Sequence, residues 1–163
     1  MIKFNLLKNL NEIINNYDGF IIDIWGVLWD GIEPYEYAQT TLEKLKKRNK
    51  KIILLSNAPR RAKVVSDKLS SIGIYNNLYD TIVSSGEVCR QECLANSSKI
   101  SVLGKKYYFI GQETDKGIAL ELEIKEVSSI NKSSFLLVCG TRDFDHTLDN
   151  YIEELDEGLR YDL

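Results

Sequence analysis

The sequence feature that most constrains the fold is a short apolar run near the N-terminus, Gly19 to Trp25, which reads GFIIDIW. Its side chains leave almost no polar face, as expected of a central strand that is covered on both sides. Similar runs follow at 51–55 and 79–84, and stretches with helical spacing lie between and after them, at 38–48, 60–72 and 86–95. This alternation predicts βα units, and therefore an α/β fold with a doubly wound, mostly parallel sheet.

The character of the chain changes at the polar, turn-rich segment 96–104. Beyond it, strands are predicted at 107–110 and 135–139, and helices at 117–122 and 147–155. We therefore predict two regions, 1–95 and 96–163. The first residues, up to Gly19, mix apolar side chains with Lys, Asn and Glu, which predicts a short amphipathic helix.

The composition argues against several classes of partner. The net charge is −3 and the basic residues are scattered, so no patch suited to nucleic acid is expected. No continuous apolar segment is long enough for a membrane span or a signal peptide, and three cysteines cannot all pair internally. These features predict a cytoplasmic protein with reduced thiols and no membrane partner.

Polar residues stand at the predicted ends of three successive strands. They are Asp23, Ser56 and the segment 84–86. In an open parallel sheet, ligands bind at the carboxyl ends of the strands, so these residues are expected to converge on one site. Asp23 is either a nucleophile and metal ligand or a cap of the following loop, and the residue alone does not decide between these roles.

The pattern around Asp23 extends over about half the chain. The segments DIWGVL and KIILLSNA, followed by SIGI and DTIVSSG, resemble in order and spacing the haloacid dehalogenase hydrolases of subclass IIA, the p-nitrophenyl-phosphatase-like branch. The motif here is DxWGV in place of DxDGV. The resemblance implies a Rossmann-like core into which a large cap of the second type is inserted.

The resemblance also implies roles for single residues. Asp23 would attack phosphorus to form an aspartyl-phosphate and would bind Mg²⁺ together with the backbone carbonyl of Trp25. The phosphoryl group would be bound by the Ser56 hydroxyl, with Asn57 beside it, and by the backbone amides of Gly26 and Val27. At the third strand end, Ser85 and Gly86 would either contact the substrate or belong to a helix cap formed through Glu87.

Trp25 departs from the family pattern. The usual residue there is a second Asp that protonates the leaving group, and an indole N–H cannot replace it. Asp30 is a candidate substitute, although Asp-Gly is first of all a turn signal.

The family's later lysine and acidic metal pair have no convincing copy, so we expect the chain to end within the cap, with 96–163 as a partial cap domain. Such a chain would expose a sheet edge and could associate with a second copy. One alternative is a complete capless phosphatase that uses Lys116 with Asp143 and Asp145. Another is an inactive remnant or a module that binds a small phosphorylated metabolite. In each of these interpretations the expected ligand is a small phosphorylated metabolite.

Overall fold

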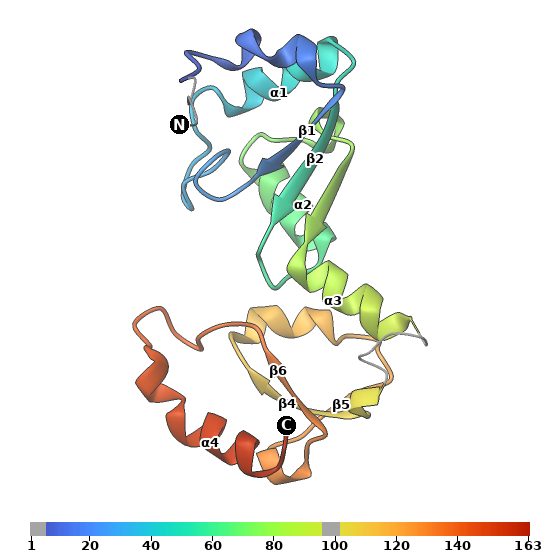
Figure 1. Ribbon diagram of the computed structural model, residues 1–163, viewed down its shortest axis with the longest axis vertical. Coiled ribbons are helices and arrows are strands. Elements are labelled where there is room, and N and C mark those ends of the chain that lie inside the picture. The colour runs from blue at the N-terminus through green and yellow to red at the C-terminus, as the bar shows by residue number, and fades with distance from the viewer. Residues whose placement is uncertain (1–5, 96–101) are drawn as a thin grey trace, which may run out of the picture. The chain divides into compact units, whose positions relative to one another are not determined.

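The computed structural model describes residues 6–95 and 102–163, which form two three-stranded sheets with helices around them (Figure 1). The strands are β1 Gly19–Asp23, β2 Lys51–Ser56, β3 Thr81–Ser84, β4 Lys106–Ile110, β5 Lys125–Glu126 and β6 Phe135–Val138. The α-helices are α1 Ala38–Lys47, α2 Ala62–Ser71, α3 Ser85–Leu94 and α4 Ile152–Arg160. The predicted α/β class with parallel strand pairing is confirmed.

The chain forms two compact units. The first consists of Met1–Ser56 with Ser66–Val83, and the second of Asn57–Val65 with Ser84–Leu163. The predicted division cuts the chain once, into a core of residues 1–95 and a partial cap of residues 96–163, whereas each unit here combines two segments. The predicted division stays a prediction.

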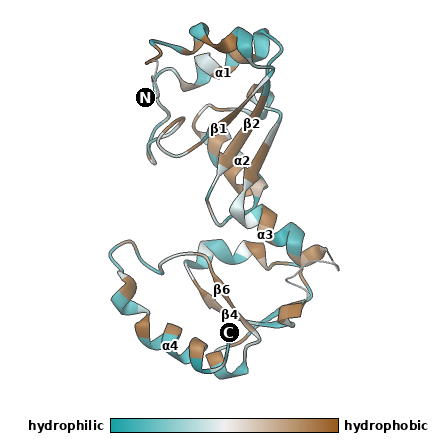
Figure 2. Cartoon of the chain, in the orientation of Figure 1, coloured by the Kyte–Doolittle hydropathy of each residue, from teal (hydrophilic) through white to brown (hydrophobic). Residues whose placement is uncertain are grey.

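The first sheet has the order β1-β2-β3, which leaves β1 at its edge. Strands β1 and β2 run parallel, with Gly19 beside Lys51 and Asp23 beside Leu55. Ile52 and Leu54 of β2 are fully buried, as are Leu42 and Leu45 of α1. Figure 2 shows the apolar character of β1 and β2. The core of this unit therefore lies between the sheet and helices whose apolar residues recur at helical spacing.

The second sheet has the order β5-β4-β6, and both of its strand pairs are parallel. A cluster of Tyr107, Phe109, Ala119 and Phe135 forms the core beside it. On α4, Gly158 is buried against Leu136 of β6, where a Cβ would lie 2.9 Å from a methyl carbon of that leucine. Strand β5 is very short and was not predicted, because two residues carry too little periodicity to be recognised.

Several element boundaries differ from the predictions. The first strand ends at Asp23 rather than Trp25, because the chain turns at Ile24 and Gly26 takes a positive φ of 76°. The N-terminal segment forms two 3₁₀ turns, Leu10–Glu12 and Ile14–Asn16, instead of an amphipathic α-helix. At the first turn the Asn9 side chain accepts from the backbone N–H of Asn11, in competition with the hydrogen bonds of a helix.

Two predicted helices of the second unit are also different. The one expected at 117–122 is a 3₁₀ helix at Glu113–Ile118, and Glu121 takes a positive φ of 62°, which stops any continuation. The one expected at 147–155 is divided into a 3₁₀ turn, Leu148–Asn150, and α4. Among the described residues, no helix has the length and apolar character needed to cross a membrane.

Candidate active site

Asp23 is the last residue of β1, and its side chain is exposed to solvent. Its Oδ1 accepts a hydrogen bond from the backbone N–H of Ile24 at 2.8 Å. The carboxylate is thus held at the carboxyl end of a parallel strand, where the sheet geometry gives access to ligands. One carboxylate oxygen thus braces the turn, which is the capping role considered from the sequence, whereas the role of nucleophile and metal ligand stays a prediction.

Ser56 occupies the equivalent place on the neighbouring strand. It is the last residue of β2, one position beyond Leu55, which is paired with Asp23. Alternation along the strands puts Asp23 and Leu55 on the more exposed face, and Ser56, only 9% exposed, on the opposite one. The strand ends therefore meet at one edge, and a group that touches both side chains would lie above that edge.

The loop after β1 uses its own backbone amides. The N–H of Gly26 donates to the carbonyl of Trp29 at 2.8 Å, and the N–H of Val27 donates to the carbonyl of Ile24 at 3.3 Å. Leu28 and Trp29 donate to the same Ile24 carbonyl. The amides of Gly26 and Val27, which the resemblance gives to the phosphoryl group, thus hold the turn in this conformation.

Trp25 belongs to an aromatic cluster that the sequence alone did not reveal. Its indole is 60% exposed and lies edge-on to Trp29, with ring centroids 5.2 Å apart. A Cβ on Gly31 would lie 2.6 Å from the Trp25 ring, so only glycine permits this contact. The Lys68 ammonium stands over the Trp29 ring at 5.1 Å.

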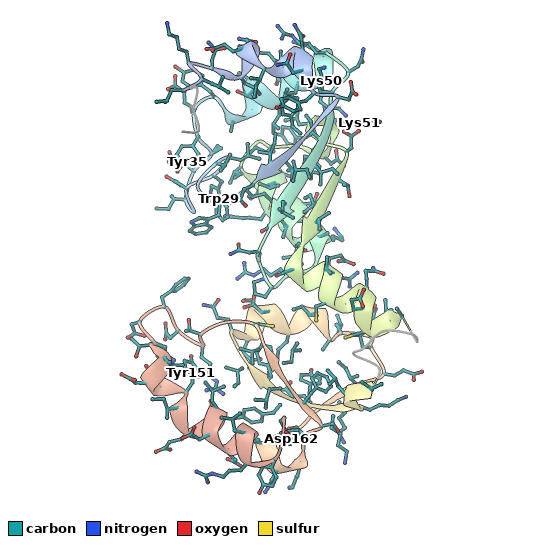
Figure 3. The ribbon with its side chains drawn as sticks, viewed as in Figure 1. Trp29, Tyr35, Lys50, Lys51, Tyr151 and Asp162 are labelled. Carbon is teal, nitrogen blue, oxygen red and sulfur yellow. The ribbon has the colours of Figure 1, made fainter. Side chains whose placement is uncertain are left out.

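Trp29 lies in the loop between β1 and α1 (Figure 3), and its indole Nε1 is buried without a hydrogen-bond acceptor among the described residues. Neither indole of the pair can give up or take a proton at ordinary pH, since an indole N–H is only a hydrogen-bond donor. Position 25 therefore carries an aromatic surface where the family pattern has an acid.

Asp30 is a turn residue in the same loop. Its Oδ1 accepts from the backbone N–H groups of Glu33 and Ile32, each at 2.8 Å. These two bonds hold the pKa of the Asp30 carboxyl below its usual value, and the bond from Glu33 has the larger effect. A carboxyl with a lowered pKa is ionised at neutral pH, so Asp30 is poorly suited to donate a proton to a leaving group.

The segment 84–86 is bound to the loop that follows β2. Ser84 is the N-cap of α3: its hydroxyl accepts from the N–H of Glu87 at 3.3 Å and donates to the carbonyl of Arg60 at 2.6 Å. The Ser85 hydroxyl is within hydrogen-bond distance of the carbonyls of Asn57 and Ala58, at 2.8 and 2.9 Å. The structure thus shows the capping role for this segment.

Gly86 is buried where α3 approaches the same loop, and its N–H donates to the carbonyl of Ala58 at 3.3 Å. A Cβ at Gly86 would lie 2.4 Å from the backbone nitrogen of Arg60, which no side chain could occupy without a shift of the backbone. Glycine is therefore required here by close packing. Asn57, whose side chain is exposed, contributes its carbonyl to this junction.

Two ion pairs of the second unit were not predicted. Glu87 accepts from Arg61 Nε at 2.9 Å and from the N–H of Ala62 at 3.1 Å, and its pKa is lowered, mostly by Gln91. Arg60 Nε donates to Asp115 at 2.8 Å, although Asp115 is only 5% exposed. Partners so far apart in the sequence carry no local signal.

The residues of the capless alternative have partners of their own. The Lys116 ammonium lies 2.8 Å from a carboxylate oxygen of Glu113 and 2.8 Å from one of Glu126. Both glutamates raise the pKa of Lys116, and Glu113 has the larger effect. Asp143 accepts from the N–H of Phe144 at 2.8 Å, and Asp145 is exposed in the same loop. All of them belong to the unit of the second sheet, whereas Asp23 belongs to the first. The capless interpretation stays a prediction.

The oxygen donors for a metal at Asp23 are few. Within 6–95 and 102–163, no group of three or more His, Cys, Asp or Glu side chains is arranged to hold an ion. Mg²⁺ in phosphoryl-transfer sites is nevertheless bound by as few as one or two carboxylates, with waters and substrate phosphate as the other ligands. Asp23 with the backbone carbonyl of Trp25 fits the protein share of such a set.

Comparison with known proteins identifies relatives over most of the chain. A family model described as "Haloacid dehalogenase-like hydrolase" matches residues 20–125. Phosphoglycolate phosphatase 1A, a chloroplastic protein of Arabidopsis thaliana, is 29% identical over 72% of this chain and 31% of its own length. The 4-nitrophenylphosphatase of Schizosaccharomyces pombe is 29% identical over 63% of this chain and 36% of its own length. The chain thus spans about a third of these curated relatives.

Solved structures show the same fold. A haloacid dehalogenase-like hydrolase from Brucella suis superposes with a TM-score of 0.84 at 27% identity, over 97% of this chain and 56% of that one. A glycerol phosphate phosphatase from Mycobacterium tuberculosis, solved in complex with magnesium, gives a TM-score of 0.63 at 17% identity over 91% of this chain and 43% of that one. The Rossmann-like α/β core suggested by the sequence is confirmed, and the chain belongs to the haloacid dehalogenase-like hydrolases.

Proposed function

We propose that this chain carries the nucleophile half of a phosphatase site that acts on small phosphate monoesters. The observation that supports this most directly is the position of Asp23, an exposed carboxylate at the carboxyl end of β1, beside the strand end that carries Ser56. The phosphatase names of the curated relatives agree with this chemistry. Because the chain spans only about a third of their length, the activity of the whole protein is part of the proposal.

In the proposed reaction, a carboxylate oxygen of Asp23 attacks phosphorus, the phosphorus–oxygen bond to the leaving group breaks, and an aspartyl-phosphate forms. Water then attacks that phosphorus, releasing inorganic phosphate and restoring the carboxylate. The leaving alkoxide needs a proton in the first step. Trp25 cannot supply it and Asp30 is held ionised, so solvent is the proton donor and substrates with good leaving groups are favoured.

Mg²⁺ is part of the proposal, since it would neutralise charge on the phosphoryl oxygens when bound. Asp23 would orient one carboxylate oxygen toward the ion and the Trp25 carbonyl would be the second protein ligand. The hydroxyl of Ser56 would donate to the phosphoryl group above the strand ends. Asn57, Ser85 and Gly86 would shape the neighbouring loop through the hydrogen bonds of that junction.

A second candidate function is binding of a small phosphorylated metabolite without turnover. Trp25 favours it, because an aromatic surface stands where the proton donor is expected. Neither candidate involves nucleic acid or membrane. A cytoplasmic location and association of two copies through the β1 edge belong to the proposal as well, the former resting on the reduced cysteines expected from the sequence.

The test is hydrolysis of p-nitrophenyl phosphate with and without Mg²⁺ by the wild type and by Asp23→Asn. Asp18→Asn, which alters another exposed carboxyl just before β1, is the matched control. Turnover that needs Mg²⁺, is lost in Asp23→Asn and is kept in Asp18→Asn supports the proposal. Equal rates in the wild type and in Asp23→Asn would remove the catalytic assignment.

Acid quenching followed by mass spectrometry separates the two candidates. A phosphorylated peptide that contains residue 23 is expected for the hydrolase. If turnover and phosphopeptide are both absent while Asp23-dependent phosphate binding persists, the binding function is the correct one.

A further inference from the structure

The second sheet has the strand order typical of a ligand site. Its central strand is β4, the next strand in sequence, β5, lies on one side, and β6 lies on the other. All pairs are parallel, so the carboxyl ends of the three strands lie at one edge. The chain passes from the central strand to a neighbour on one side and then crosses to a strand on the other side. At such a reversal of strand order a crevice opens at the carboxyl ends, and small molecules bind there in open α/β sheets.

A cavity of about 480 Å³ lies at that edge. Its lining comes from the residues that follow each strand: 111–114 after β4, 126–128 at the end of β5, and Arg142 after β6. This volume is in the range that small-molecule sites occupy. The position given by the strand order and the position of the cavity therefore coincide, and both lie within the second unit.

The charged groups of the cavity are compensated by one another. Lys116 is bonded to Glu113 and Glu126 at 2.8 Å each, which uses two of the three ammonium protons. The two outer nitrogens of Arg142 each bind one oxygen of Glu154 at 2.8 Å, a bidentate pair. The lining holds two cations and two carboxylates, so it carries no excess charge that would favour an ion over a neutral ligand.

The remaining lining offers neutral hydrogen-bond groups and ring surface. Gln112, Thr114 and Ser128 carry amide and hydroxyl groups, and Tyr108 and Phe109 provide aromatic surface. The Lys116 ammonium lies over the Phe109 ring at 5.3 Å, which fixes both side chains. Donors and acceptors on several sides of a part-aromatic cavity match a molecule with several hydroxyl groups and apolar C–H faces.

We propose that this cavity binds a small, uncharged, polyhydroxylated molecule of the size of a monosaccharide. The ligand hydroxyls would donate to Glu126 and accept from Lys116 and Gln112 without separating the ion pairs. The proposal does not depend on phosphate hydrolysis at Asp23, because no residue of that site lines the cavity.

The experiment is ligand-observed NMR on the full chain, using saturation transfer with glucose, galactose, mannose and glycerol, and with methyl phosphate and acetate as charged probes. Lys116→Met tests the central group, and Thr114→Val tests a hydroxyl of the lining. Lys105→Met is the matched control, since it removes a lysine of the same unit whose pair with Glu123 at 2.9 Å is exposed and outside the cavity.

We expect saturation transfer to at least one of the neutral polyols, about tenfold weaker binding in Lys116→Met, and unchanged binding in Lys105→Met. Thermal melting of each variant shows that the fold is kept, and Thr114→Val gives a second reading if Lys116→Met unfolds. Transfer to none of the polyols, transfer only to the charged probes, or equal binding by wild type and both cavity variants would overturn the proposal.

Discussion

At position 25 a tryptophan stands where the family pattern has an acid. The turn after β1 is held by amides that donate to Ile24 and Trp29, and it does not depend on the side chain of residue 25. The indole instead packs on Gly31 and against Trp29. The acid of the family pattern is therefore absent at this position, while the carboxylate of Asp23, the proposed nucleophile, is present.

Trp25→Asp is expected to increase turnover of substrates with poor leaving groups. A carboxyl two residues after Asp23 can protonate the leaving oxygen, and such a group contributes roughly two orders of magnitude or more. The measurement is kcat/KM for an alkyl phosphate against p-nitrophenyl phosphate, whose good leaving group needs less help. Trp25→Phe is the control, and a similar gain in that variant would contradict the acid role.

Gly86→Ala is expected to destabilise the protein by roughly 1–3 kcal/mol, because the added Cβ would meet the Arg60 backbone and force a shift. Gly117→Ala is the matched control, since a Cβ there meets nothing within 4 Å. Urea unfolding of both variants measures the difference. Equal stability of the two would show that the loop after β2 yields at little cost.

At the scale of elements, the ends of strands and helices are held by side chains from elsewhere in the chain. Helix α4 is bound to the loop after β6 by the Arg142–Glu154 pair, and Tyr108 of β4 donates to the same carboxylate. The pKa of Glu154 is lowered, and the hydrogen bond from Arg142 is the largest cause. In the same way Glu87 binds α3 to the start of α2. These contacts join segments that have no local preference for one another.

The pH dependence of stability follows from the lowered pKa of Glu154. Because the pKa of Glu154 is lower in the folded chain, the unfolded chain takes up the proton first as the pH falls. The stabilisation is complete above the unfolded pKa of this carboxyl and is lost as the pH falls through its folded pKa. Glu154→Gln should cost about 1 kcal/mol at neutral pH, after allowance for solvent screening, and less at pH 3. Melting temperatures at both pH values measure this.

The exposed residue next to it, Glu153, provides the control. Glu153→Gln should leave the melting temperature almost unchanged at both pH values. A Glu154→Gln effect of the same size at pH 3 as at pH 7 would mean that the lost contact is not ionic.

At the scale of the molecule, the first sheet is open at β1. The strand order leaves β1 with one partner, and its Ile21 is 70% exposed although its neighbours in the sequence are those of a buried strand. An unprotected edge of this kind can pair with the same edge of another copy.

Ile21→Lys is therefore expected to reduce self-association. Light scattering coupled to size-exclusion chromatography should show a concentration-dependent increase in mass for the wild type and a monomer for the variant. Ile32→Lys changes an isoleucine that is even more exposed, at 80%, and lies in a loop, and this variant should associate like the wild type. A wild type that stays monomeric at all concentrations would contradict pairing through β1.

The sequence determined the α/β class, the strands of both sheets except β5, and the position of Asp23 and Ser56 at neighbouring strand ends. These follow from apolar runs, their spacing and their turn residues, which act over a few neighbours in the chain. The family resemblance added the role of each residue, and the comparisons confirmed the family.

Only the tertiary structure decided which groups Trp25, Ser85, Gly86 and Lys116 contact. The indole packs on a glycine six residues later, the Ser85 hydroxyl meets a carbonyl of residue 57, and Lys116 pairs with Glu113 of its own 3₁₀ helix and with Glu126 of β5. These partners are selected by packing in three dimensions, some within a turn and some between separate elements, and the hydrophobic periodicity of the sequence does not encode them. For the same reason, the cavity at the end of β4 depends on the order of strands in the sheet.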